Sequence, residues 1–267
     1  MNRRVFLIKS AFLLTSSFFG LSSFSKSFAF YKKTNKSLPQ PLISIIIDDI
    51  GYSTSHARDF LRLNIPITFS ILPRLSNSYN LAVEIHDNGH EIMLHQPMEP
   101  YNSHLDPGPG ALFVGYKPQK ISRIMEENIS IAPFATGVNN HMGSRFTSCG
   151  TEISEALRAI RDRDLFFIDS LTSGRSVAYK TARKLQMPAA CRNIFLDNCL
   201  EDKYILRQLH KLQIHAKLHG HAIGIGHPFP ETAIGIRRFI SNSKHSSVSF
   251  VHISDILSVL NNNTDYS

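Results

Sequence analysis

Short apolar runs alternate with amphipathic stretches along most of the chain, from about residue 42 to residue 261. The first run, 42–47, is rich in isoleucine and too short for a buried helix, and the stretch after it has the pattern of a helix. Repetition of this pair predicts an α/β domain built from βα units. Strands are predicted at 42–47, 67–71, 91–94, 134–138, 165–168, 192–196, 222–226 and 248–251. Helices are predicted at 53–63, 76–88, 118–131, 151–162, 175–186, 201–219, 231–241 and 253–261.

Polar residues follow six of these strands. The carboxyl ends of parallel strands converge on one face of a barrel, where active sites of such folds lie. The sequence therefore predicts a (β/α) barrel with a single polar mouth. The residues concerned are Asp48 and Asp49, His95, Asn139 to His141, Asp169 and Ser170, Asp197, and His227.

Asp48 and Asp49 are adjacent acids at the end of the first strand. Because side chains alternate along a strand, the two carboxylates are expected to point in different directions. One can then bind a cation while the other accepts a proton from water. The structural alternative is that Asp49 or Ser53 caps the helix that follows.

Two histidines flank the strand within 89–99. His90 and His95 would lie on opposite faces and roughly 16 Å apart, so they are not expected to share a metal ion. His95 is the candidate ligand at the mouth, and His90 is expected to be structural. Glu99 follows in a Pro-containing turn and could fold back towards the site, or be exposed to solvent. Imidazole with carboxylate suits zinc, and a further carboxylate would admit manganese or other divalent ions.

The fourth strand leads into a dense polar segment. His141 could supply a third metal ligand and leave an open position for water. Asn139, Asn140 or the backbone amides near Gly143 and Ser144 could hold a carbonyl oxygen as it gains charge. The alternative is a turn whose asparagines satisfy backbone groups.

Later strands end in further candidates. Asp169, followed by Ser170, could orient a catalytic partner, and Arg192 with Asp197 could form a supporting pair or a purely structural ion pair. His227 follows a glycine, and its imidazole titrates near neutral pH, which suits a general acid.

The first 29 residues have the layout of a signal peptide. Arg3 and Arg4 begin a basic segment that also resembles the twin-arginine pattern, 6–21 is largely apolar, and small residues lie at 27 and 29. An uncleaved membrane anchor is the alternative. The predicted organisation is a signal peptide at 1–29, a linker at 30–41 and a barrel domain at 42–262, in an exported protein of the periplasm or medium with no membrane span after cleavage.

Charge and cysteine content narrow the function. The net charge of +8 falls to +4 without the first 29 residues, and the remaining basic residues form no run, which argues against nucleic acid as a partner. A mildly basic surface suits anionic envelope polymers. Of the three cysteines, Cys191 and Cys199 could pair, or all could be free thiols, and the absence of Cys-x-x-Cys argues against a thiolate metal site.

The candidate site residues and their neighbours resemble the motifs of the divergent polysaccharide deacetylase family. This family is a distant branch of the NodB-homology, carbohydrate esterase family 4 fold. The resemblance runs from about residue 41 to 260, with its motifs in family order. They are 47–49 with Gly51 and Tyr52, 89–99, 139–144, 167–170, 192–197 and 225–228.

The resemblance implies a distorted (β/α) barrel of about seven parallel strands. It also implies removal of N- or O-linked acetyl groups from a cell-envelope polysaccharide, such as peptidoglycan, or a related carbohydrate. One divalent ion is implied, zinc first, with manganese or cobalt as alternatives. By position, Asp48 matches the catalytic base, Asp49 a metal ligand, His95 the first metal histidine and His227 the catalytic acid.

Two departures from the family pattern keep other functions open. Glu99 stands where ordinary members have a second metal histidine, and 139–144 replaces an Arg- and Pro-containing motif. One alternative is therefore a catalytically inactive periplasmic protein that binds carbohydrate or a partner on the same barrel. Another is a different metal-dependent hydrolase, although no His-x-His pair follows the first strand.

Overall fold

The computed structural model describes residues 40–242 and 248–264 of the 267-residue chain. The predicted signal peptide and nearly all of the predicted linker lie outside these ranges, so both stay predictions. Within the described ranges, every helix is too short or too polar to cross a bilayer.

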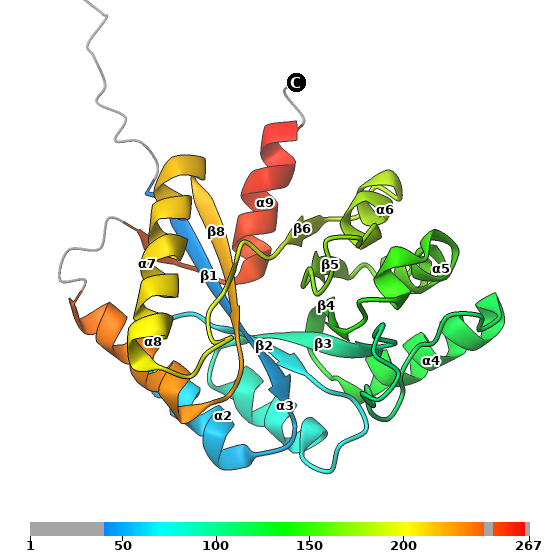
Figure 1. The fold of residues 1–267 in the computed structure, drawn as a ribbon, viewed down its shortest axis with the longest axis horizontal. Coiled ribbons are helices and arrows are strands. Elements are labelled where there is room, and N and C mark those ends of the chain that lie inside the picture. The colour runs from blue at the N-terminus through cyan, green and yellow to red at the C-terminus, as the bar shows by residue number, and fades with distance from the viewer. Residues whose placement is uncertain (1–39, 243–247, 265–267) are drawn as a thin grey trace, which may run out of the picture. The chain divides into compact units, whose positions relative to one another are not determined.

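Parallel strands form one curled sheet, a half-barrel, which confirms the predicted α/β fold of the distorted (β/α)-barrel type (Figure 1). The strand order is β6-β5-β4-β3-β2-β1-β8-β7, with β9 paired to β1. The predicted strand at 192–196 is the short β7, beside β8, and an additional strand that was not predicted, β6, precedes it and pairs with β5. The bounds are β1 Leu42–Ile50, β2 Thr68–Ile71, β3 Glu91–Met98, β4 Ala135–Met142, β5 Phe166–Asp169, β6 Ala189–Cys191, β7 Ile194–Phe195, β8 His221–Gly226 and β9 Ser249–Phe250.

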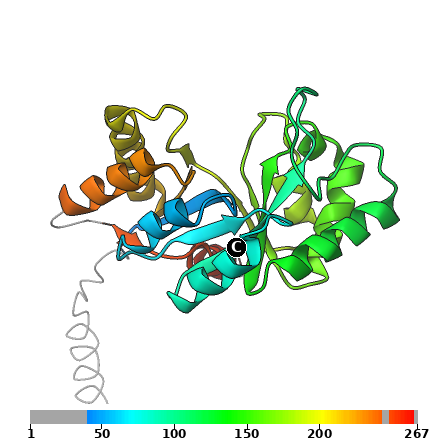
Figure 2. The same ribbon diagram turned by 90° about the horizontal axis from the view of Figure 1, so that it is seen from below.

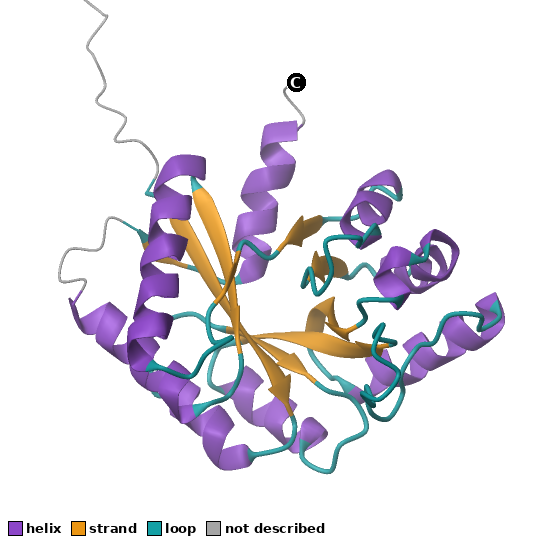
Figure 3. Cartoon of the chain, viewed as in Figure 1, coloured by secondary structure: helices purple, strands orange, loops and turns teal. Residues whose placement is uncertain are grey.

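Helices cover the outer face of the sheet in two groups (Figures 2 and 3). One group packs against β1, β2 and β8, and the other against β3, β4 and β5, and each group encloses its own apolar core. The first group is α2 Thr54–Leu61, α3 Ser78–Asp87, α7 Asp202–His219 and α8 Pro230–Asn242; the second is α4 Pro118–Ile131, α5 Gly150–Arg161 and α6 Ala178–Lys184.

The inner face of the sheet is closed by α9, Ile253–Thr264, which lies between β8 and β6 (Figure 1). Ile253 and Ile256 pack on inward-facing residues such as Ile46, because alternate residues of β1 face opposite sides. Glu91 anchors this helix: its Oε2 accepts hydrogen bonds from the Ile253 and Ser254 amides at 2.9 and 3.3 Å. Thr68 Oγ1 donates to the same oxygen at 2.8 Å. A buried carboxylate thus caps the positive end of the helix.

Three strands run further than their apolar runs predict. β1 ends at Ile50, β3 at Met98 and β4 at Met142, whereas the predicted ends were 47, 94 and 138. The extra residues of β3 and β4 pair with each other, with His95 opposite Asn139 and Pro97 opposite His141, whereas Asp48 and Asp49 of β1 lie in an irregularity of the strand between Ile47 and Ile50. The polar residues expected beyond β1, β3 and β4 are therefore held within strands, which fixes their backbones.

Candidate metal centre and active site

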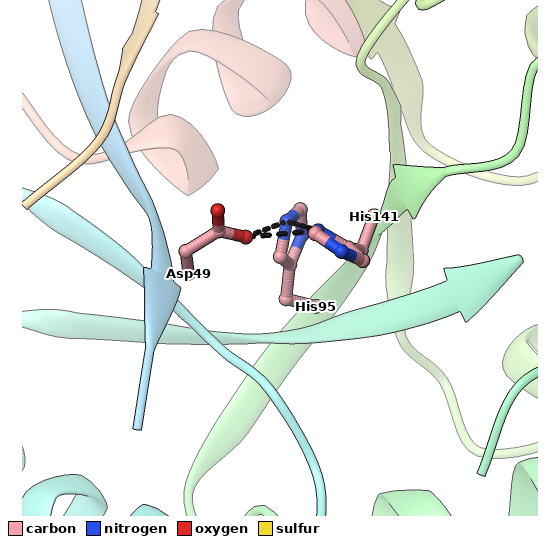
Figure 4. Close-up of side chains that lie close together, drawn as sticks. All are labelled: Asp49, His95 and His141. Atoms are coloured by element: carbon pink, nitrogen blue, oxygen red, sulfur yellow. Dashed lines mark hydrogen bonds and ion pairs between the residues drawn. The ribbon is translucent and has the colours of Figure 1, made fainter. Parts of the chain in front are cut away.

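Asp49, His95 and His141 bring three potential ligand atoms together from β1, β3 and β4 (Figure 4). Asp49 Oδ1 lies 3.1 Å from His95 Nε2 and 2.8 Å from His141 Nδ1. The two ring nitrogens are 3.2 Å apart. Residues distant in sequence thus converge on one point, as the strand-end argument predicted.

The chemistry of this cluster fits a divalent cation. Asp49 Oδ1 is buried and, among the described residues, has no partner with hydrogen-bond geometry despite its two close ring nitrogens. A cation held by all three atoms would satisfy that oxygen. Two imidazoles and one carboxylate are a common catalytic zinc set, which leaves a fourth position for water or substrate.

The electrostatics of the cluster also favour a positive charge. Burial alone raises the pKa of Asp49, but the close contacts and charges of the His141 and His95 rings hold it well below its usual range. Burial lowers the pKa of His95, yet the charges of Asp48 and Asp49 and the contact with Asn139 raise it above its ordinary value. The Asp49 carboxylate therefore draws positive charge to this point, whether carried by a proton or by a metal ion.

An unusual backbone conformation directs the Asp49 side chain towards the cluster. Its φ is 57°, in the left-handed region, and the β1–β2 register shifts between Ile47 and Ile50. The bulge turns the Asp49 carboxylate back towards the mouth. Asp48 Oδ2 lies 3.7 Å from His95 Nε2, so both carboxylates face the same ring. The expectation that they point in different directions, based on regular strand alternation, is wrong.

His227 lies on the other flank of the cluster. Its Nε2 is 3.9 Å from Asp49 Oδ2, and its Nδ1 is 3.0 Å from Asp197 Oδ1. Burial lowers the pKa of His227, but the hydrogen bond and charge of Asp197, with the charges of Asp48 and Asp49, raise it to about 9. In this arrangement His227 can hold a proton at neutral pH.

Asp197 is bound to His227 and not to Arg192. Its Oδ2 accepts from the His227 amide at 2.6 Å and from Thr232 Oγ1 at 2.8 Å. Arg192 instead donates to the carbonyls of Ser170 and Leu171 at 2.7 and 3.0 Å. The predicted Arg192–Asp197 pair is therefore wrong, because one residue follows β6 and the other follows β7.

Asn139 is buried beneath the cluster and already bonded on both sides, unlike a free donor for substrate. Its Nδ2 donates to Asp48 Oδ1 at 2.8 Å and to Ser170 Oγ at 3.3 Å. Its Oδ1 lies 2.7 Å from His95 Nδ1. The neighbouring Asn140 faces away: it accepts from the Ser170 amide at 2.9 Å and donates to the Met142 carbonyl at 2.8 Å.

Glu99 lies outside the cluster. Its Oε1 accepts from Arg145 at 2.7 Å, and its Oε2 accepts from the Val114 amide at 2.7 Å. Both oxygens thus hold the loops after β3 and β4. Ser144, in the same turn, accepts from the Tyr101 amide at 2.9 Å. Gly143 has a φ of 81°, and a Cβ there would meet Met98, so the turn itself requires glycine.

Asp169 organises a loop. It accepts from the Leu171 amide at 3.0 Å, from Ser176 Oγ at 2.6 Å and from the Tyr179 amide at 3.2 Å. Among the described residues, Asp169 makes no contact with the cluster of Asp49, His95 and His141. It therefore stabilises its own loop and does not have the predicted role of orienting a catalytic partner.

His90 lies at the opposite end of β3, as expected. Its Nδ1 accepts from the Ile67 amide at 3.4 Å, and it lines a cavity of about 320 Å³ with His86 and His252. This cavity is remote from the candidate metal centre along the strand. Ser53, and not Asp49, caps α2 by accepting from the His56 amide. Cys149, Cys191 and Cys199 are free thiols.

The family model described as divergent polysaccharide deacetylase matches residues 45–257 of this chain. The chain belongs to that family. The match includes the three residues of the candidate metal centre together with Asp48 and His227. The resemblance drawn from the sequence motifs is therefore confirmed.

A curated relative and a solved structure are similar to this chain over most of its length. YibQ of Escherichia coli (strain K12), an uncharacterized protein, is 30% identical over 201 residues, which is 75% of this chain and 62% of YibQ. The chain thus spans less than two thirds of that relative. The structure of protein ATU2773 from Agrobacterium tumefaciens C58, also uncharacterized, matches with a TM-score of 0.76 and 25% identity over 82% of this chain and 90% of that one.

Two more distant structures share the fold. The catalytic domain of a peptidoglycan N-acetylglucosamine deacetylase from Eubacterium rectale ATCC 33656 has a TM-score of 0.51 at 13% identity, over 80% of this chain and 88% of its own. BA3943 of Bacillus anthracis, a CE4 family pseudoenzyme, has a TM-score of 0.50 at 15% identity, over 82% and 66%. The fold is thus found both in a deacetylase and in a pseudoenzyme.

Sequence reasoning missed the aromatic residues around His227. The rings of Phe195 and Phe229 lie 5.2 and 5.8 Å from the His227 ring, measured between centroids. Phe229 is 38% exposed, so one side of its ring beside His227 is open to solvent. Its position two residues after His227 was the only signal, and an apolar residue there is as compatible with packing as with a substrate wall.

Proposed function

We propose that this member of the family is a metal-dependent hydrolase that removes acetyl groups from a cell-envelope polysaccharide or related carbohydrate. One observation carries the proposal: three ligand atoms of Asp49, His95 and His141 converge beside an acid, Asp48, that is not among them. The family description supports the reaction class. The predicted signal peptide supports export to the periplasm or medium.

Asp49, His95 and His141 would hold the ion, with zinc the first candidate and manganese or cobalt as alternatives. When bound, the ion supplies a Lewis acid that polarises the acetyl carbonyl and a water molecule. Glu99 takes no part, because its two oxygens hold Arg145 and the Val114 amide.

Asp48 is the general base in this proposal. Asn139 occupies its Oδ1, so Oδ2 is the atom left to accept the proton of the attacking water. The side chain is almost completely buried beside His95, which keeps it close to the reacting atoms and shielded from bulk solvent. Proton transfer from a positioned carboxylate contributes about 10²- to 10⁴-fold to rate.

His227 is the general acid. Held by Asp197 at Nδ1, it presents Nε2 beside Asp49 and can protonate the departing amine or alcohol. The backbone amides of the turn at Gly143 and Ser144 remain our candidates for holding the oxyanion, since the Asn139 and Asn140 side chains are engaged within the protein.

The direct test is acetate release from N-acetylated and O-acetylated peptidoglycan fragments by purified protein. We expect release that stops after treatment with a chelator and returns on adding zinc, manganese or cobalt. Binding of the fragments without release, with each metal supplied, would favour the alternative of an inactive carbohydrate-binding protein on the same barrel.

A further inference from the structure

Asn139 connects the proposed base with a proposed metal ligand. It lies in β4 directly opposite His95 in β3 and is completely buried. One side of its amide contacts Asp48 and the other contacts His95, at 2.8 and 2.7 Å. Because the residue has no access to solvent, neither contact can be replaced by bulk water.

The partners fix the orientation of this amide. A carboxylate can only accept, so the NH₂ group of Asn139 must face Asp48 and its oxygen must face His95. The amide oxygen can only accept as well, so Nδ1 of His95 carries the hydrogen. Nε2 of His95 then keeps its lone pair on the side where Asp49 and His141 lie.

We propose that Asn139 is a positioning residue with two separate tasks: its oxygen sets the tautomer of His95 for metal binding, and its NH₂ group holds Asp48 so that only Oδ2 can accept a proton. This inference rests on the proposed function for the second task and only on metal binding for the first. Of the short side chains, asparagine alone offers a donor and an acceptor in one plane at this reach.

The surroundings support this division. Ser170 Oγ shares the NH₂ group at 3.3 Å, and the Ser170 amide is bonded to Asn140, so β5 and β4 together hold the Asn139 side chain in place. Partners that orient a metal-binding histidine typically change metal affinity by about 10- to 100-fold when removed.

Two substitutions separate the tasks. Asn139→Asp keeps an acceptor towards His95 and removes the donor towards Asp48, whereas Asn139→Leu removes both at similar volume. Zinc affinity is measured by competition with a chromophoric chelator, and turnover by acetate release at saturating zinc. Asn102→Asp, in an exposed turn where the carboxylate keeps the acceptor for the His104 amide, is the matched control.

We expect Asn139→Leu to lower zinc affinity by about 10- to 100-fold. Asn139→Asp should keep zinc affinity at or above the wild-type value while kcat falls about 100-fold with little change in KM. The control should match the wild type in both measurements. A merely structural role would lower both quantities together in both variants.

Equal loss of zinc affinity in Asn139→Asp and Asn139→Leu would overturn the inference, as would unchanged turnover in Asn139→Asp. Absence of zinc binding by the wild type would overturn the first task outright. Zinc binding with the expected split in affinity, but no acetate release by the wild type, would overturn the proposed function while the task at His95 stands.

Discussion

Asp197 contacts His227 at two points. One carboxylate oxygen lies 3.0 Å from the ring Nδ1, and the other accepts a hydrogen bond from the His227 backbone amide at 2.6 Å. Gly226 leaves room for this approach, because a Cβ at that position would be in tight contact with Asp197 Oδ2, at 3.2 Å. The ring is thereby fixed with Nε2 towards Asp49 of the candidate metal centre. The same contacts with Asp197 thus fix the orientation of the His227 ring and favour its protonated form.

Asp197→Asn should therefore weaken catalysis without affecting metal binding. The amide can still accept from the backbone, but it removes the negative charge that helps raise the pKa of His227 to about 9. We expect kcat for acetate release to fall about 10- to 100-fold and zinc affinity to stay unchanged. An equal loss of kcat and of zinc affinity would show that Asp197 supports the whole mouth and not His227 alone.

The same substitution should change the pH dependence of stability in the metal-free protein. The folded pKa of His227 is raised, so its stabilising contribution is complete below pH 6.5 and is lost as pH rises through about 9. The free energy of unfolding of the wild type should thus fall across this range relative to Asp197→Asn. Urea titrations at several pH values measure this, and parallel curves for the two proteins would contradict it.

His141 and Glu99 offer a matched comparison for the third ligand. His141→Ala removes an atom of the cluster, and we expect zinc affinity to fall at least 100-fold, beyond the loss of about 10- to 100-fold for a supporting residue. Glu99→Gln should leave zinc affinity within about threefold, because Glu99 contacts Arg145 and the Val114 amide instead. The reverse order of effects would return Glu99 to the ligand set.

Asp48→Asn tests the base. The new amide can still accept from Asn139, so the fold and the zinc site should persist, while the group can no longer take a proton. We expect kcat to fall about 10²- to 10⁴-fold with zinc affinity unchanged, as measured by acetate release and chelator competition. Wild-type turnover in this variant would remove Asp48 from the reaction.

Glu91→Ala tests what holds α9 on the barrel. The substitution removes the acceptor of the Ile253 and Ser254 amides and of Thr68, all on one oxygen. We expect a loss of about 2–3 kcal/mol in the free energy of unfolding, since hydrogen bonds to a buried charge are the stronger kind. Zinc affinity in the still-folded variant should not change, because Glu91 lies at the start of β3 and contacts α9, away from the atoms of the cluster. A change in free energy below about 0.5 kcal/mol, the usual range for surface substitutions, would show that the cap is dispensable.

Hydrophobic periodicity by itself determined the alternation of strands and helices, and with it the face on which Asp49, His95 and His141 would meet. Such patterns are local, and a run such as 42–47 can bury its side chains only as a strand within a parallel sheet. The predicted helix at 118–131 has the same bounds in the structure, because Pro118 favours a helix start and Ile121 and Met125 lie on its buried side.

Only the tertiary structure decided how the side chains are used. Asp49 joins the cluster through a left-handed backbone within a bulge, Glu99 is taken by Arg145, and Asn139 is buried between Asp48 and His95. None of these contacts lies within a few residues in sequence. The direction of a side chain depends on local dihedral angles and on partners from distant strands, and neither leaves a periodic trace in the sequence.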